Sequence, residues 1–405
     1  MALAYESQEK LAVIDALTAS SAARWLADYR GQPLVIEDIV KNVFDRVRDD
    51  GVQIMRFGVN LSDYHPQVIG RSYVFEKEMG LEITNREYTP KRTDMYLDSP
   101  IRVIQEGRAD ALRRRLDGPN AQVDFPIVRE LKERGATDYV GVAMDFSDGS
   151  RHFASWTTDR AGGFTQTQLN LLDALLPLLS VRLEVAHSRR VTQQLLTTYL
   201  GVEATRRILS GEFRRSLGED IRAVIFYCDL RGFTALTDRL SSAEIIAVLS
   251  EYYDAVAGAV RNRGGDIIEM IGDGMIAIFR ITDDFTAEQA ATMALEAARE
   301  ACRALQAVPA ARLPESVSEL RAGFALNVGQ VTFGNIGSGD RLDFTIIGPS
   351  VNEASRIEPL TKTLGQSILM TSDFAKLTSD EAIHSLGFHT LRGVREPREI
   401  FALTD

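Results

Sequence analysis

The chain has 405 residues, of which 45% are hydrophobic and 25% charged, as in an ordinary soluble globular protein of two or three domains. Its formal net charge of −11 argues against a general nucleic-acid-binding protein, because such proteins carry basic surfaces. The two cysteines, Cys228 and Cys302, do not form a disulfide framework, so we expect a cytoplasmic setting. We expect no signal peptide and no membrane span, because the most apolar run, residues 171–186, is interrupted by charges and a proline.

The first part of the chain predicts an α+β domain. Apolar residues at helical spacing predict helices over 7–30 and 35–49, and strands follow in 52–61 and 71–88. Two short helices (99–116 and 125–135), a hairpin with its turn at Asp148-Gly149 (138–159) and a long helix (164–201) complete it.

This order of elements resembles a GAF-like sensor domain, which we expect over residues 1–182. One interpretation is a regulatory domain that receives a small-molecule or protein signal, and the other is a packing or dimerisation domain without a ligand. His65, which has no second histidine or cysteine beside it in the sequence, is interpreted as structural.

Residues 183–218 predict an amphipathic helical linker that ends in a glycine-containing turn. Its apolar side would form a seam between two chains or pack on its own domain. We expect a second domain over 219–405. Its predicted elements are a strand (221–230), a helix (241–265), a hairpin (266–279), a helix (285–308), a strand-turn-strand (320–337), a helix from 349, and C-terminal strands. This order suits a palm-like α/β domain better than a doubly wound one.

The segment YCDLRGFTALT places Asp229 where an apolar strand ends and a tight turn begins. A carboxylate there can hold a divalent cation, while the backbone N–H groups of Gly232, Phe233 and Thr234 meet phosphate oxygens. Asp273 lies in a predicted Asp-Gly hairpin turn, and two such aspartates can share a pair of Mg²⁺ ions that clamp a polyphosphate. Each aspartate alone also fits an ordinary turn or cap.

The segment DFTIIGPSVNEASRIEPL places Asn352 and Arg356 at i and i+4 on one helix face. An arginine can stabilise charge on a transferring phosphoryl group and an asparagine can orient a ribose oxygen. Taken alone, this pair also fits a solvated helix face.

Together, the segments CDLRGFT, IEMIGDGMIAIF, GNIGSGDRLDFTIIG and GPSVNEASR resemble the catalytic domain of class III nucleotidyl cyclases, the adenylate and guanylate cyclases, over about 221–405. The resemblance implies a palm-like, ferredoxin-like fold that converts a nucleoside triphosphate to its 3′,5′-cyclic monophosphate and diphosphate. It implies two Mg²⁺ or Mn²⁺ ions per site, held by Asp229, Asp273 and the Leu230 backbone. It also implies a head-to-tail homodimer, in which Asn352 and Arg356 come from the other chain and act in the transition state.

The resemblance further implies a triphosphate contact at Arg392 or Arg395 and a base pocket at Glu269 and Thr345. Adenylate cyclases usually carry Lys at the first base position with Asp or Thr at the second, and guanylate cyclases carry Glu with Cys or another small residue. An ionised Glu accepts from the guanine N–H and amino groups, and Thr can donate to the guanine carbonyl. This pairing favours GTP as the substrate. We keep ATP as the alternative, because Thr at the second position is also typical of bacterial-type adenylate cyclases.

Two other functions compete with this interpretation. The run Gly264-Gly265-Asp266 echoes the Gly-Gly-Asp-Glu-Phe signature of diguanylate cyclases, but Ile267-Ile268 follow and nothing else matches. We therefore interpret Asp266 as a solvated turn residue without a chemical role. A catalytically silent nucleotide-binding module is the non-enzymatic alternative, although the four main site residues are all present. Asn327, where many relatives carry His, receives no catalytic role.

Overall fold

The computed structural model describes residues 17–28, 35–62, 68–87, 94–212, 218–338, 341–380 and 382–403. Contacts divide the chain into two compact units, Met1–Leu195 and Leu196–Asp405, and each is described by itself. His65 and half of the first predicted helix, residues 7–16 and 29–30, lie outside the described residues. In the parts of the chain that are described, no helix combines the length and the apolar character that a membrane span needs.

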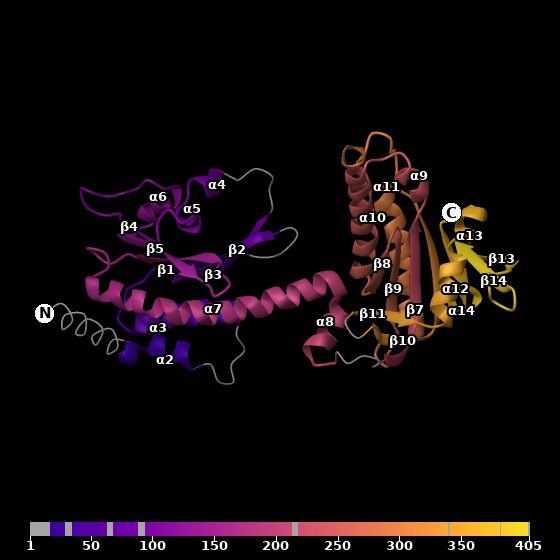
Figure 1. Cartoon of the computed structure of the whole chain (residues 1–405), viewed down its shortest axis with the longest axis horizontal. Helices are drawn as coiled ribbons and strands as arrows, with labels where there is room; N and C mark the ends of the chain where they lie inside the picture. Colours follow the sequence, from indigo (N-terminus) through magenta and orange to yellow (C-terminus); the bar gives the residue numbers. More distant parts are fainter. Residues whose placement is uncertain are drawn as a thin grey trace. The chain divides into compact units, whose positions relative to one another are not determined.

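Unit 1 is built on a six-stranded antiparallel sheet in the order β3-β2-β1-β6-β5-β4. Helices α2, α3 and α7 cover one face of this sheet, and α5 and α6 cover the other (Figure 1). The strands are β1 (Arg56–Ser62), β2 (Val68–Glu76), β3 (Gly80–Glu87), β4 (Ala111–Arg115), β5 (Asp138–Asp145) and β6 (Arg151–Thr158). The helices are α2 (Ser21–Ala27), α3 (Ile36–Asp49), α4 (Asp94–Leu97), α5 (Pro100–Gln105), α6 (Pro126–Glu133) and α7 (Gln166–Leu200).

The helix predicted over residues 99–116 is wrong in its second half. Helix α5 ends at Gln105, and residues 111–115 form the edge strand β4, which pairs with β5. The segment Ala-Leu-Arg-Arg-Arg favours a helix locally, but pairing with β5 overrides this weak preference. The strand also places Arg113 within 2.6 Å of Asp138, a fully buried carboxylate that needs a cationic partner.

Unit 2 contains an eight-stranded sheet in the order β13-β14-β12-β10-β7-β9-β8, with β11 paired to β10, which confirms the predicted α/β class. Helices α10 and α11 lie side by side on one face (Figure 1), and α12 packs on the other. The strands are β7 (Gly218–Leu230), β8 (Asp266–Ile271), β9 (Gly274–Arg280), β10 (Ala322–Gly337), β11 (Leu342–Ile347), β12 (Ile368–Thr371), β13 (Ile383–His389) and β14 (Arg398–Leu403). The helices are α8 (Val202–Leu209), α9 (Phe233–Thr237), α10 (Ser242–Asn262), α11 (Ala287–Gln306), α12 (Pro349–Ile357), α13 (Leu360–Thr363) and α14 (Ser372–Ala375).

The strand-turn-strand predicted over residues 320–337 is instead one long strand, β10. Gly329 lies inside this strand, where the absence of a side chain allows close approach of a neighbouring element. A Cβ atom at this position would lie 2.0 Å from the Ser350 hydroxyl oxygen, at the start of α12. A glycine inside a strand often marks such a contact.

Helix α8 packs directly on the sheet of unit 2, within the segment predicted to be a linker. Helix α7 ends at Leu200, and Gly201 adopts a positive φ of 83° that separates the two helices. The guanidinium of Arg207 lies 4.9 Å from the ring centre of Phe333 in β10, and that of Arg280 lies 4.8 Å from the same ring. Glu203 is 3.0 Å from Arg207 and 3.5 Å from Arg280. Stacking and ion pairing therefore fasten α8 to the sheet.

Candidate active site

Asp229 lies near the end of β7 with a glycine beside it on each neighbouring strand. Its register partners are Gly274 in β9 and Gly323 in β10. Side chains directly opposite one another share a face of the sheet, so two absent side chains leave space around this carboxylate. The second half of the strand, from Ala223 on, is otherwise apolar and largely buried, and the glycines make room beside Asp229 at its end.

Asp273 lies in the two-residue turn Gly272–Asp273 between β8 and β9, and Gly272 has a φ of 62°. The sequence predicts a turn at Asp273-Gly274. The observed turn, Gly272–Asp273, lies one residue earlier, because Gly274 already belongs to β9. The Leu230 N–H donates to the Asp273 carbonyl oxygen at 3.2 Å, which ties this turn to the end of β7.

The carboxyl groups of Asp229 and Asp273 are neighbours, near enough for the charge of Asp273 to act on Asp229. Burial raises the pKa of Asp229, and the nearby charges of Asp273 and Glu358 raise it further. Two neighbouring acids in a half-buried site repel each other, and a bound cation relieves that repulsion.

The donor set fits a magnesium or manganese ion, because two carboxylates and the Leu230 carbonyl are the hard oxygen ligands that such cations prefer. Among the described residues, no group of three or more His, Cys, Asp or Glu side chains is arranged to hold a metal.

Glu358 is a nearby acid that the sequence analysis missed. It is 7% exposed, and its carboxylate accepts from the Thr361 hydroxyl at 3.3 Å. A Cβ atom at Gly323 would lie 2.2 Å from Glu358 Oε1, so this carboxylate occupies the space beside Asp229 that Gly323 leaves open. Burial raises the pKa of Glu358. In the sequence, Glu358 shows only as an acid among apolar residues, two positions after Arg356. Its contact with the space beside Asp229 is not visible there.

Asn352 and Arg356 both lie on α12, as predicted, with Asn352 exposed and Arg356 partly exposed. A Cβ atom at Gly393 would lie 3.5 Å from the Arg356 guanidinium, so this arginine lies over the loop between β13 and β14. That loop carries Arg392 and Arg395, both exposed. The structure therefore brings Arg356 close to the predicted triphosphate-binding loop.

A buried polar network fixes α12, and the sequence analysis missed it too. Asn327, 2% exposed, donates to the Ser350 carbonyl at 2.9 Å and to Glu353 at 3.4 Å. The side-chain amide oxygen of Asn327 accepts from the Thr371 hydroxyl at 2.9 Å, and Glu353 forms an ion pair with Arg398 at 2.7 Å. A fully bonded amide in a buried place orients the elements around it.

Glu269 in β8 faces the same side of the sheet as Asp229 because of a β-bulge. Ile267 pairs with Ala277 and Glu269 with Ile276, so Ile268 is an extra residue between them. A bulge re-aims the side chains that follow it, and without it Glu269 would face the helices α10 and α11. Thr345 lies in β11, a strand that contacts β8, so the two predicted base-reading residues come from touching strands.

Residues 219–404 match the family model described as the adenylate and guanylate cyclase catalytic domain. Unit 2 is a class III nucleotidyl cyclase domain. This family assignment confirms the recognition made from the four sequence segments. The remaining predicted residues, Gly232, Phe233 and Thr234, follow Asp229 in the cyclase domain at the start of α9, where Gly232 has a φ of 77°.

Several known cyclases are similar to the chain. Adenylate cyclase 1 of Rhizobium meliloti (strain 1021) is 32% identical over 176 residues, which are 42% of this chain and 26% of that protein. The adenylyl cyclase CyaB from P. aeruginosa is 25% identical with a TM-score of 0.41, covering 47% of this chain and 96% of that one. The guanylyl cyclase Cya2 is 29% identical with a TM-score of 0.40, covering 46% and 93%. The chain spans about a third or less of the length of the curated relatives it matches.

Asp266 is not the solvated turn residue that we expected. It is the first residue of β8 in the cyclase domain and is partly buried, and its carboxylate lies near Gly201, beside α8. Burial raises the pKa of Asp266 to about 6, and the charge of Glu203 adds to the shift while Arg280 opposes it. Because Asp266 belongs to β8 and not to a turn, its carboxyl group is partly removed from water.

We expect Asp266→Asn to stabilise the cyclase domain near neutral pH. A folded-state pKa of about 6, above the ordinary 3.8, means that the folded protein binds this proton more tightly. The stability linked to the protonated acid is present at low pH and is lost as the pH rises through about 6. The variant should therefore melt higher than the parent at pH 7.5, and the gap should close toward pH 4.

Melting curves across this pH range would check the expectation, with Asp284→Asn as the control at an exposed position. A gap that does not change with pH would contradict it.

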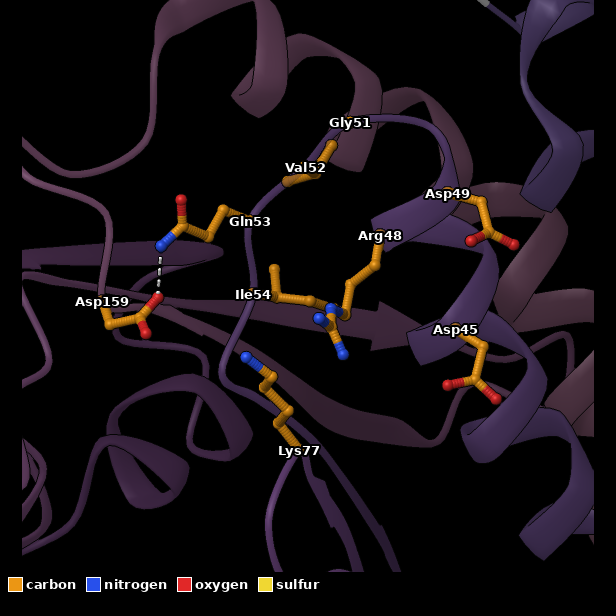
Figure 2. Close-up of a pocket in the computed structure, with 9 residues that line it drawn as sticks. All are labelled: Asp45, Arg48, Asp49, Gly51, Val52, Gln53, Ile54, Lys77 and Asp159. Carbon is orange, nitrogen blue, oxygen red and sulfur yellow. Dashed lines mark hydrogen bonds between the residues drawn. The ribbon is translucent and has the colours of Figure 1, made fainter.

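Unit 1 contains a separate surface hollow of about 620 Å³ (Figure 2). Arg48 and Lys77 point toward each other in it, and Gln53 donates to Asp159 at 2.8 Å. The other lining residues are Asp45, Asp49, Gly51, Val52 and Ile54. Two cations and three acids leave no dominant charge, and no predicted site residue belongs to this hollow.

Proposed function

We propose that this chain converts a purine nucleoside triphosphate, with GTP favoured, into the 3′,5′-cyclic monophosphate and diphosphate. The observation that carries the proposal is the neighbouring carboxyl groups of Asp229 and Asp273, at the end of β7 and in the hairpin turn between β8 and β9 of a cyclase domain. Two acids in contact beside glycines form an anionic site that suits cations bound to a triphosphate. In the reaction, the ribose 3′-oxygen bonds to the α-phosphorus, the bond to the β-phosphate oxygen breaks, and the hydroxyl proton is released.

Asp229, Asp273 and the Leu230 carbonyl would hold two Mg²⁺ or Mn²⁺ ions. When bound, these cations lower the pKa of the ribose hydroxyl and offset the charge of the triphosphate. Asn352 orients a ribose oxygen, and Arg356 stabilises the charge that builds up on the α-phosphate. The loop under Arg356 then supplies Arg392 or Arg395 to the β- and γ-phosphates.

The base is read by Glu269 and Thr345. An ionised Glu accepts two hydrogen bonds from guanine, whereas against adenine it would face a ring nitrogen that also accepts. A mispaired buried polar group costs about 1–3 kcal/mol, which corresponds to about tenfold or more in selectivity. ATP is the second candidate, because Thr345 suits an adenine amino group and the Rhizobium relative is named an adenylate cyclase.

We propose further that two copies pair head to tail, so that each site combines the Asp229 group of one copy with the Asn352 and Arg356 of the other. Exposed apolar residues flank both groups: Ile271 is 58% exposed before the Asp273 turn, and Ile347 is 53% exposed before α12. A second copy would cover them. In this proposal unit 1 is a GAF-like regulatory domain, and the chain acts in the cytoplasm.

The test is an assay of the purified chain with Mg²⁺ or Mn²⁺ and each of ATP, GTP, CTP and UTP, measuring cyclic nucleotide and diphosphate. We expect GTP to give the most cyclic product. Cyclic AMP as the main product would instead establish the second candidate. Nucleotide binding without turnover of any triphosphate would contradict the proposal and support a silent regulatory module.

A further inference from the structure

The turn that carries Asp273 is held from two sides. From the sheet, the Leu230 N–H donates to the Asp273 carbonyl. From the helix layer, the hydroxyl of Tyr253 in α10 donates to the Gly272 carbonyl at 2.7 Å, and the Gly274 carbonyl lies 3.3 Å from the same hydroxyl. The two glycine carbonyls flank Asp273 in the chain, so one tyrosine spans the whole turn.

The hydroxyl of Tyr253 is well placed to hold a peptide group in one orientation. Its ring packs against the helix-side core and lies 5.0 Å from the ring of Tyr252. Burial raises the pKa of Tyr253 to about 12, so the group stays a phenol and a donor near neutral pH. The Gly272 carbonyl belongs to the peptide bond whose nitrogen is that of Asp273. Its orientation therefore helps to set the direction of the Asp273 side chain.

We propose that Tyr253 is a positioning residue for the divalent-cation site, because it holds the Gly272–Asp273 turn where both carboxylates can bind one cation. The inference rests on the proposed function in that it assigns this site to a cation. Gly272 has a positive φ, and a glycine in a turn can adopt other backbone conformations, which would change the direction of the Asp273 side chain. A hydrogen bond that removes those alternatives raises cation affinity without touching the cation.

The adjacent tyrosine provides a matched control. Tyr252 is fully buried on the same helix, and its hydroxyl lies 3.2 Å from the Cys228 thiol, whereas the Tyr253 hydroxyl binds the turn carbonyls. Tyr253→Phe and Tyr252→Phe each remove one hydroxyl from α10. A purely structural role predicts a loss of stability from both variants and no specific effect on cations.

The experiment is a Mn²⁺ titration of the full chain without nucleotide, followed by electron paramagnetic resonance, with melting temperatures measured in parallel. We expect Tyr253→Phe to weaken Mn²⁺ binding by about three- to tenfold, and Tyr252→Phe to leave it within about twofold even where its melting temperature falls more. Unchanged binding in Tyr253→Phe, an equal loss in both variants, or no Mn²⁺ binding by the parent would overturn the inference. If Tyr253→Phe alone weakened Mn²⁺ binding but the parent chain cyclised no nucleotide, the proposed function would be rejected and the inference about Tyr253 would stand.

Discussion

Replacing Asp273 by Asn should reduce cyclase turnover by about 10²–10³-fold or more and leave the domain folded. The change keeps the shape of the side chain and removes the charge that a cation needs. Losing a group that stabilises transition-state charge costs about 3–4 kcal/mol, which corresponds to this factor. The turn itself should persist, because its hydrogen bonds from Leu230 and Tyr253 reach backbone carbonyls rather than the carboxylate. Product formation at saturating Mn²⁺, together with circular dichroism, would measure both parts of the prediction.

Asp266→Asn is the matched control, since it makes the same chemical change seven residues earlier, at the start of the same hairpin. Its turnover should equal that of the parent chain. If Asp273→Asn retained full activity, the assignment of this carboxylate to the cations would be wrong.

Replacing Glu269 by Lys should shift the substrate preference from GTP toward ATP. Lysine only donates, so it matches the adenine ring nitrogen and confronts the guanine N–H and amino group with another donor. Mispairing at a buried polar group costs about 1–3 kcal/mol, and we expect kcat/KM for GTP to fall by about 10- to 100-fold. The ATP to GTP ratio of kcat/KM should rise by at least that factor, because Thr345 remains as a partner for adenine.

Met270→Lys tests whether this effect depends on the face of the strand. Met270 follows Glu269 in the regular part of β8, so it faces the opposite side of the sheet, where it is 50% exposed. The same charge on the neighbouring residue should leave the base preference unchanged. An equal shift in both variants would mean that net charge, and not contact with the base, controls the choice.

The sequence contained most of what identifies the cyclase domain. Asp229, Asp273, Asn352 and Arg356 could be predicted as site residues because each lies in a short segment that carries the resemblance to the cyclases. The long helices were also predicted well, and α10 and α11 each begin with a capping box, at Ser241 and Thr286. Signals of this kind act over a few residues, so they can be recognised without knowing the fold.

The residues that support the site could not be found in this way. Glu358, Tyr253 and Asn327 act on Asp229, the Asp273 turn and α12 from distant parts of the chain, and no local pattern records those contacts. The two errors in secondary structure have the same origin. Residues 111–115 form a strand because they pair with β5. Gly329 does not end its strand, and its lack of a side chain instead leaves space for Ser350. Tertiary contacts decide both outcomes.

If Glu269 reads the base as we propose, the bulge at Ile268 makes that recognition depend on how β8 is aligned with β9, as well as on which residues β8 contains. Strand β8 is at the end of the sheet order and pairs only with β9 among the described strands. If it slipped by one position, Ile268 or Met270 would replace the acid in the pocket while Asp229 and the core strands stayed in place. On the proposed function we therefore expect base selectivity to be lost at a lower temperature than turnover, because an edge strand can shift register before the sheet melts.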